Sequence, residues 1–159
     1  MKVKTRSKTG SRTKPKSRKP SIHPVTRYAR DVAAGTRLAG RLVRLACERH
    51  LRDLEEGATR GVRFDERAAT RAIEFFGFLN LAEGAHAGKP FRLEPFEQFI
   101  VGSLFGWLGP DGFRRFRTAY VEIGKGNGKS PMAAGIGLYG LFADGEIGAE
   151  IYSAAATSG

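Results

Sequence analysis

Hydrophobic residues recur every three or four positions along much of the chain, which is the spacing of helices with one buried face. The pattern predicts a short helix at about 25–34, interrupted by Gly35, and a longer one that Thr36 can cap. Asp65 is a good N-cap for a helix at about 66–79, whose phenylalanines we expect in the core. A further helix is predicted at about 95–107.

The pattern changes after the turn at 109–112, where Pro110 presets φ and glycine permits positive φ. Residues 116–123 (FRTAYVEI) are rich in β-branched and aromatic side chains and predict a strand. An apolar helix follows at 130–143, and 149–153 (AEIYS) indicates a second strand. Helices followed by strand–loop–helix–strand predict an α/β fold with a parallel sheet.

Composition indicates a folded body. The chain has 159 residues, 41% of them hydrophobic and 27% charged, which suits one globular domain. No run of eighteen apolar residues is present, so we expect no membrane span. The single cysteine, Cys47, cannot form an internal disulfide and is expected to be a small buried hydrophobe in a reducing cytosol. His50 has no second ligand at metal-binding spacing and is expected to be structural.

The net charge of +11 belongs to one end of the chain. Residues 1–20 contain nine of the 27 Lys and Arg residues and no acid, whereas the other eighteen are nearly balanced by sixteen acidic residues. We therefore expect residues 1–22 to form a disordered basic tail. Two interpretations stay open, a segment that attracts polyanions such as nucleic acid and a tail that only improves solubility.

The segment Gly124–Ser130 (GKGNGKS), between the predicted strand and helix, carries the chemistry. A phosphate-binding loop places successive backbone amides around phosphate oxygens at a helix N-terminus, and glycines let the backbone approach closely. Gly124, Gly126, Asn127 and Gly128 form the loop backbone, Lys129 is the expected phosphate lysine, and Ser130 is the expected Mg²⁺ ligand.

The loop departs from the strict phosphate-loop pattern, which places a glycine at Ile123. Pro131 is tolerable in the first turn of a helix but biases Ser130 away from helical angles. Lys125 is a second cation, either touching the γ-phosphate and stabilising charge during hydrolysis or simply facing solvent. The alternative to a nucleotide site is a glycine-rich turn between strand and helix.

The run from Phe91 (FRLEPFEQFIVGSLFGW) through GKGNGKS to IYSAA resembles the ATPase start of the large terminase subunit of tailed bacteriophages. The upstream segments RYARDVAAGTRLAGRLVRLACERHLRDL and FDERAATRAIEFFGFL resemble the N-terminal helices of that family. The resemblance implies N-terminal helices in 23–92, followed in 93–159 by an incomplete P-loop NTPase parallel sheet. It covers everything except the basic tail.

The resemblance also implies a function. Such proteins are DNA-packaging motors that use ATP and Mg²⁺ to drive double-stranded viral DNA into a procapsid in the cytoplasm of a bacterial host. The implied partners are the small terminase subunit and the portal, with a homo-oligomeric ring in the full-length protein. The family's adenine-reading aromatic–glutamine pair falls on Phe96 and Glu97, with Gln98 one place later. Because an ionised Glu97 can only accept hydrogen bonds, either Gln98 reads adenine or the selectivity is relaxed.

In a full-length terminase the acidic strand end that orders Mg²⁺, the catalytic glutamate and the nuclease carboxylates all come later in the chain. Asp144, Glu146 and Glu150 follow the loop too closely to take those places. Hydrolysis needs a group that positions water, so we expect a fragment that binds nucleotide weakly without useful turnover. The alternatives are another small P-loop NTPase or kinase, and a non-enzymatic nucleic-acid-binding protein acting through its tail.

Overall fold

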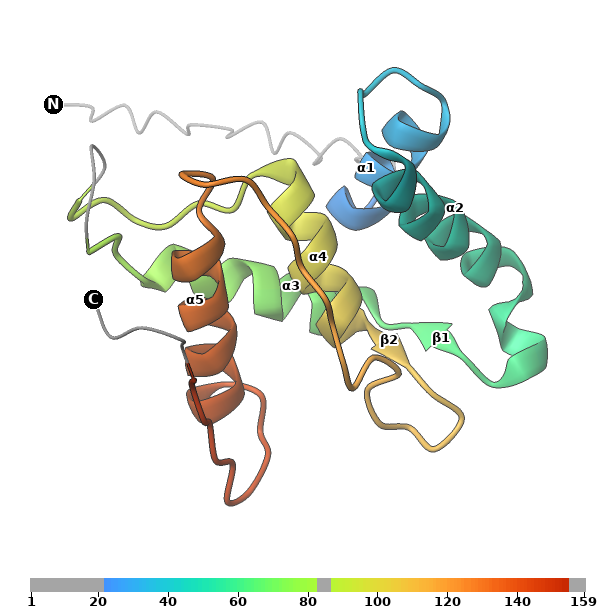
Figure 1. Cartoon of the computed structure of the whole chain (residues 1–159). Coiled ribbons are helices and arrows are strands. Elements are labelled where there is room, and N and C mark those ends of the chain that lie inside the picture. The colour runs from blue at the N-terminus through green and yellow to red at the C-terminus, as the bar shows by residue number, and fades with distance from the viewer. Residues whose placement is uncertain (1–21, 83–86, 155–159) are drawn as a thin grey trace, which may run out of the picture.

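The computed structural model describes residues 22–82 and 87–154, so the predicted basic tail lies, except for residue 22, outside the described residues. Five α-helices dominate this part of the chain (Figure 1). Along the chain the elements are α1 (Pro24–Ala33), α2 (Arg41–Glu56), η1 (Gly57–Arg60), β1 (Arg63–Phe64), α3 (Glu66–Phe75), η2 (Phe76–Phe78), α4 (Pro95–Gly106), β2 (Trp107–Leu108) and α5 (Lys129–Phe142).

The helices predicted from the sequence are confirmed, with two local corrections. Asp65 caps α3 as expected, since its Oδ1 accepts the amide of Ala68 at 3.0 Å. Thr36 does not cap α2, whose N-cap is Gly40; its hydroxyl instead donates to the carbonyl of Asp31 at 2.9 Å, just after α1. Phe76 is buried as expected, whereas Phe78 is 84% exposed because the 3₁₀ turn η2 rotates it off the buried face.

The predicted parallel P-loop sheet is not present in the described residues, which is the main correction to the fold class. The sheet there is a two-stranded antiparallel pair, β1 with β2, in which Arg63 faces Leu108 and Phe64 faces Trp107. Residues 116–123 and 149–153 form no strand. A strand requires a partner for its backbone amides and carbonyls, and neither segment has one in the described chain.

One hydrophobic cluster joins α1, α2 and α4. It buries Val25, Tyr28, Ala29, Val32, Cys47 and Phe99. Cys47 is fully buried and burial raises the pKa of its thiol to about 11, as suits the predicted small hydrophobe. At its edge His50, 3% exposed, is hydrogen bonded on both sides of its ring: the indole of Trp107 donates to Nδ1 at 3.0 Å, and Nε2 lies 3.1 Å from the hydroxyl of Thr26. His50 is thus a structural residue that ties α2 to α1 and β2.

A group of ion pairs centred on Asp53 joins α2 to η1 and to the segment that follows β2. Asp53 on α2 is buried and contacts Arg60, and its Oδ2 accepts a hydrogen bond from Arg115 at 2.6 Å. Burial alone would raise the pKa of Asp53, but the hydrogen bonds from Arg115 and Arg60 outweigh it and bring the pKa below its usual value. Arg115 also lies over the rings of Trp107 and Phe116, so it fixes the chain that leaves β2.

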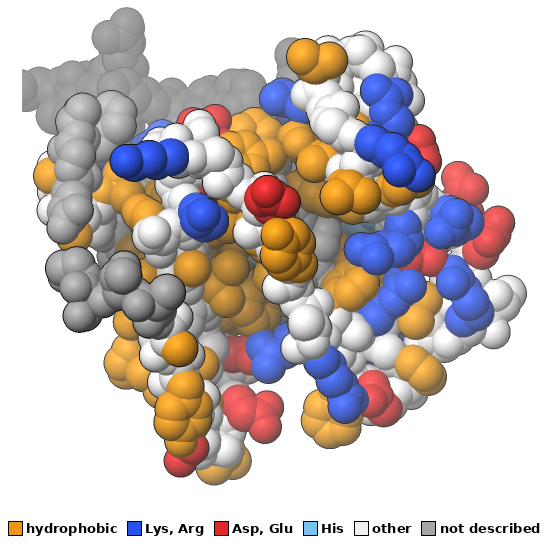
Figure 2. All heavy atoms as spheres, in the orientation of Figure 1, with side chains coloured by type: hydrophobic (Ala, Val, Ile, Leu, Met, Phe, Trp, Pro, Cys, Tyr) orange, Lys and Arg blue, Asp and Glu red, His pale blue; other side chains and the backbone are white. Residues whose placement is uncertain are grey.

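The second cluster joins α3 and α4 to α5. Its buried members are Ala72, Phe76, Phe91, Leu93, Val101, Phe105, Met132 and Tyr139, so it unites residues on both sides of the predicted boundary between 92 and 93. Helix α5 contributes Met132, Gly135 and Tyr139 at helical spacing, and a methyl group at Gly135 would overlap the ring of Phe76. Other apolar side chains of α5 are exposed, namely Leu138, Leu141 and Phe142, and Figure 2 shows hydrophobic side chains on the surface of this helix.

None of the helices in residues 22–82 and 87–154 combines the length and the apolar character needed to cross a bilayer.

The close contact between α5 and Phe76 predicts that Gly135→Ala destabilises the protein. The added methyl group must displace a buried ring, so the free energy of unfolding should fall by about 1–3 kcal/mol in urea titrations. Gly140→Ala on the same helix is the matched control, because its nearest neighbour is the tip of Ile151 at 3.4 Å. The control variant should be neutral or stabilised by up to about 1 kcal/mol. Equal losses of unfolding free energy in the two variants would contradict the close packing of α5 on Phe76.

The buried His50 predicts a loss of stability in mild acid. Burial, with a smaller contribution from His23, lowers the pKa of His50 from 6.5 to about 4. The unfolded chain therefore binds a proton that the folded chain excludes, so this contribution is complete above pH 6.5 and is lost as the pH falls toward 4.

Urea unfolding at a series of pH values should show a slope in this range that His50→Gln reduces by up to about 1.4 kcal/mol per pH unit. His23→Gln is the comparison, since burial also lowers the pKa of His23 and its ring is less deeply enclosed. Identical slopes in wild type and His50→Gln would show that His50 does not stay neutral in the folded protein.

Candidate functional site

The segment Gly124–Ser130 forms an exposed loop that leads directly into α5. Gly126 and Gly128 have φ of 84° and 74°, a region that side chains disfavour, so glycine is required at both positions. The side chain of Asn127 donates to the carbonyls of Gly124 at 3.2 Å and Lys125 at 3.4 Å, which closes the loop on itself. The carbonyl of Gly128 accepts from Met132 at 3.0 Å, so the loop passes into the first turn of the helix without a break.

The backbone amides of this loop are available to an anion. Gly128, the N-cap of α5, supplies no side-chain cap, and within the described chain no acceptor contacts the amides of residues 125–130. The aligned amides of a helix N-terminus carry partial positive charge. The side chains of Lys125, Lys129 and Ser130 are exposed around the same turn. Together they supply the donors and positive charge that a phosphate group requires, so the residues present fit a nucleotide phosphate chain.

Ser130 and Pro131 lie inside α5, although Pro131 biases its predecessor away from helical angles. Pro131 is the third residue of the helix, where its missing N–H has no intrahelical partner to lose. The proline therefore leaves the first turn intact, and the hydroxyl of Ser130 stays exposed beside the loop.

The residues on both sides of the loop pack in the same hydrophobic cluster. On the entering side Val121 and Ile123 pack against the α3–α4–α5 cluster, whereas Glu122 between them is exposed. This alternation is the one expected of a strand with one covered face. On the leaving side Met132 is buried in the same cluster.

Glu97, at the start of α4, contacts the loop itself. A methyl group built at Gly128 would lie 2.9 Å from Oε1 of Glu97, while Oε2 accepts the amide of Glu94 at 2.8 Å. The side chain is 3% exposed, and burial raises its pKa, with Glu94 adding to the increase and the hydrogen bond from the Glu94 amide opposing it. Spacing along the chain gave no indication of this contact, because 30 residues separate the two positions.

The other two predicted adenine-binding residues contact their own surroundings in the fold. Phe96 is half-buried against the α1–α2–α4 cluster. The side-chain amide of Gln98 donates to the carbonyl of Leu93 at 2.8 Å. Of the three predicted residues, the structure therefore places Glu97 beside the loop Gly124–Ser130 and engages Gln98 with the start of its own helix.

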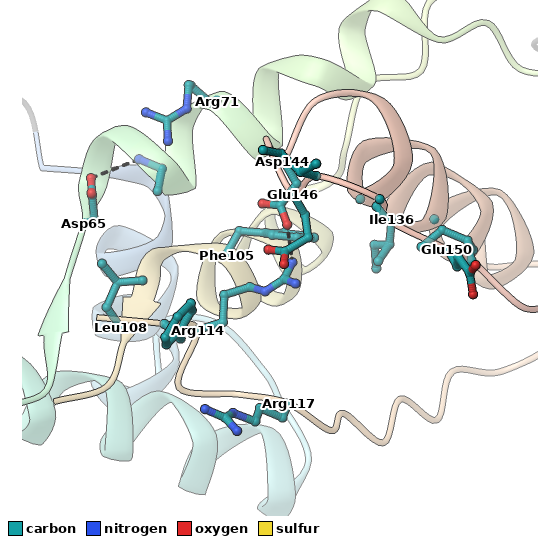
Figure 3. Close-up of a pocket in the computed structure, with 18 of the residues that line it drawn as sticks. Asp65, Arg71, Phe105, Leu108, Arg114, Arg117, Ile136, Asp144, Glu146 and Glu150 are labelled. Carbon is teal, nitrogen blue, oxygen red and sulfur yellow. Dashed lines mark hydrogen bonds and ion pairs between the residues drawn. The ribbon is translucent and has the colours of Figure 1, made fainter. Parts of the chain in front are cut away.

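An open pocket of about 1140 Å³ lies away from this loop (Figure 3). Its walls come from α3, α4, α5 and the segments around 112–117 and 144–152, and they include none of residues 124–130. Arg114 reaches across to Asp144 at 2.6 Å, and Glu146 lies beside them (Figure 3). Both segments predicted as strands contribute to the walls of this open space instead of pairing with each other.

The described residues contain no group of three or more His, Cys, Asp or Glu side chains arranged to hold a metal ion. The sequence motif predicts Ser130 as a ligand of Mg²⁺, and this role stays a prediction.

Comparison with known families agrees with the resemblance seen in the sequence. The family model for the terminase large subunit, ATPase domain, matches residues 95–159, a segment that begins with α4 and includes the whole loop. No curated protein and no solved structure matches the chain. Residues 95–159 are therefore similar to the ATPase domain of the terminase large subunit.

Proposed function

We propose that the loop Gly124–Ser130 binds the phosphates of ATP, as the nucleotide site of a terminase that packages viral DNA. The main support is an exposed loop with two positive-φ glycines and free amides at the N-terminus of α5, within a segment of an ATPase family. In this proposal the ammonium group of Lys129 neutralises the terminal phosphates, and Lys125 adds a second positive charge.

The proposed cofactor is ATP with Mg²⁺, which supplies charge neutralisation at the phosphates when it is bound. The hydroxyl of Ser130 is the protein group that would hold the ion, since it is exposed in the first turn of α5. Double-stranded viral DNA, the small terminase subunit and the portal are the partners that similarity to the family suggests.

Replacement of Lys129 tests the proposal. Lys129→Ala in the 159-residue chain should weaken binding of a fluorescent ATP analogue by about ten-fold or more, because a charged hydrogen-bond donor to phosphate is lost. Lys125→Ala should have a smaller effect, and Lys89→Ala, an exposed lysine outside the loop, should have none. Unchanged affinity in Lys129→Ala would exclude this loop as the phosphate site.

The positions of Glu97 and Gln98 predict relaxed base selectivity. Glu97 has no amide group, and the side-chain amide of Gln98 is directed to the carbonyl of Leu93 at the start of its own helix. In competition experiments ATP and GTP should bind within about ten-fold of each other, and Gln98→Ala should not change their ratio. A strong ATP preference that Gln98→Ala abolishes would instead identify Gln98 as the adenine reader.

A further inference from the structure

Glu97 is a buried carboxyl group that the phosphate-binding chemistry does not use. None of the described cations forms an ion pair with it. One of its oxygens, Oε2, is fixed by the amide of Glu94, which holds the side chain back against the start of α4. The other oxygen, Oε1, is directed at Gly128, the residue at which the loop becomes helix.

The contact with Glu97 restricts the loop at Gly128, where the backbone has a positive φ. Gly128 has φ of 74°, so the chain direction changes there from loop to the first turn of α5. A β-carbon at Gly128 would lie 2.9 Å from Oε1 of Glu97, so any side chain there would force the carboxyl group to shift. Gly126 provides the contrast, because it also has positive φ but no atom lies within 4 Å of a β-carbon built there. The two positive-φ glycines of the loop therefore serve different purposes, and only Gly128 lies against a neighbouring helix.

We propose that Glu97 is a positioning residue for the phosphate loop: it bridges the start of α4 to Gly128 and so sets where the loop amides and Lys129 stand. Phosphate binding depends on the placement of amides by a few tenths of an ångström, so a rigid support behind the loop raises affinity without touching the ligand. Glu97 supports the loop as a spacer, a side chain that holds Gly128 at a fixed distance from α4. This role requires the length of the side chain and its hydrogen bond to the Glu94 amide. The effect on nucleotide rests on the proposed function of the loop.

Binding of the fluorescent ATP analogue to the full chain tests the positioning role. Glu97→Ala removes the spacer and should weaken binding by about ten-fold, whereas Glu97→Gln keeps the volume and an oxygen for the Glu94 amide and should stay within about two-fold of wild type. Glu94→Ala is the control for the helix start, because it removes the N-cap side chain of α4 and keeps the backbone amide that Oε2 of Glu97 accepts. Equal losses in Glu94→Ala and Glu97→Ala would reduce Glu97 to a helix cap and overturn the proposal.

A double-mutant cycle without nucleotide separates this proposal from the proposed function. Gly128→Ala should lower the folding equilibrium constant in urea titrations, and Glu97→Ala should relieve part of that loss, with a coupling of about ten-fold. Gly126→Ala shares the positive φ but not the contact, so its effect should simply add to that of Glu97→Ala.

If the effects of Gly128→Ala and Glu97→Ala on the folding equilibrium constant simply add, Glu97 does not support Gly128 and the proposal is overturned. If the coupling is present and wild type binds no nucleotide, the contact stands, and both the proposed ATP site and the role of Glu97 in affinity are excluded.

Discussion

The seating of α5 on the ring of Phe76 is the contact on which the rest of the candidate site depends. Helix α5 has one buried stripe, and at its centre Gly135 lets the aromatic ring approach the helix backbone directly. Since the proposed phosphate loop ends in the first turn of this helix, the depth at which α5 sits on α3 and α4 determines where the loop amides point. A glycine in a helix normally lowers its stability, so here close packing compensates for the weaker helix propensity.

Helix α4 carries this arrangement to the rest of the molecule. One part of its surface lies in the cluster with α1 and α2, and another lies in the cluster with α3 and α5 (Figure 1). Its first turn supports the loop through Glu97, and its last residue leads into β2, where Trp107 is hydrogen bonded to His50. The helices before residue 95 thus support the element beside which the proposed phosphate loop lies, although the domain boundary at 92 and 93 stays a prediction.

The site is built with little excess charge of its own. Two exposed lysines and a set of amides without a hydrogen-bond partner in the described chain make up the site, and the nearby carboxyl group of Glu97 is buried with its pKa raised. A carboxyl group behind a phosphate site is less unfavourable when burial favours its neutral form. This arrangement is compatible with the ATPase family of residues 95–159 and assigns the support of the loop to a residue that the family resemblance had connected with adenine.

The sequence by itself determined the helices, the cap at Asp65, the loop with its glycines and lysines, and the resemblance of residues 95–159 to a terminase ATPase domain, because each depends on spacing within a few residues or on a contiguous motif. It overestimated the sheet: the residues of 116–123 and 149–153 favour strands, but a strand exists only where a second strand satisfies its backbone, and propensity cannot supply that partner. Tertiary structure alone decided that Phe78 is exposed and that β1 pairs with β2. It also decided that Glu97 meets Gly128, since contacts between residues far apart in the chain follow from how helices pack and leave no periodic trace in the sequence.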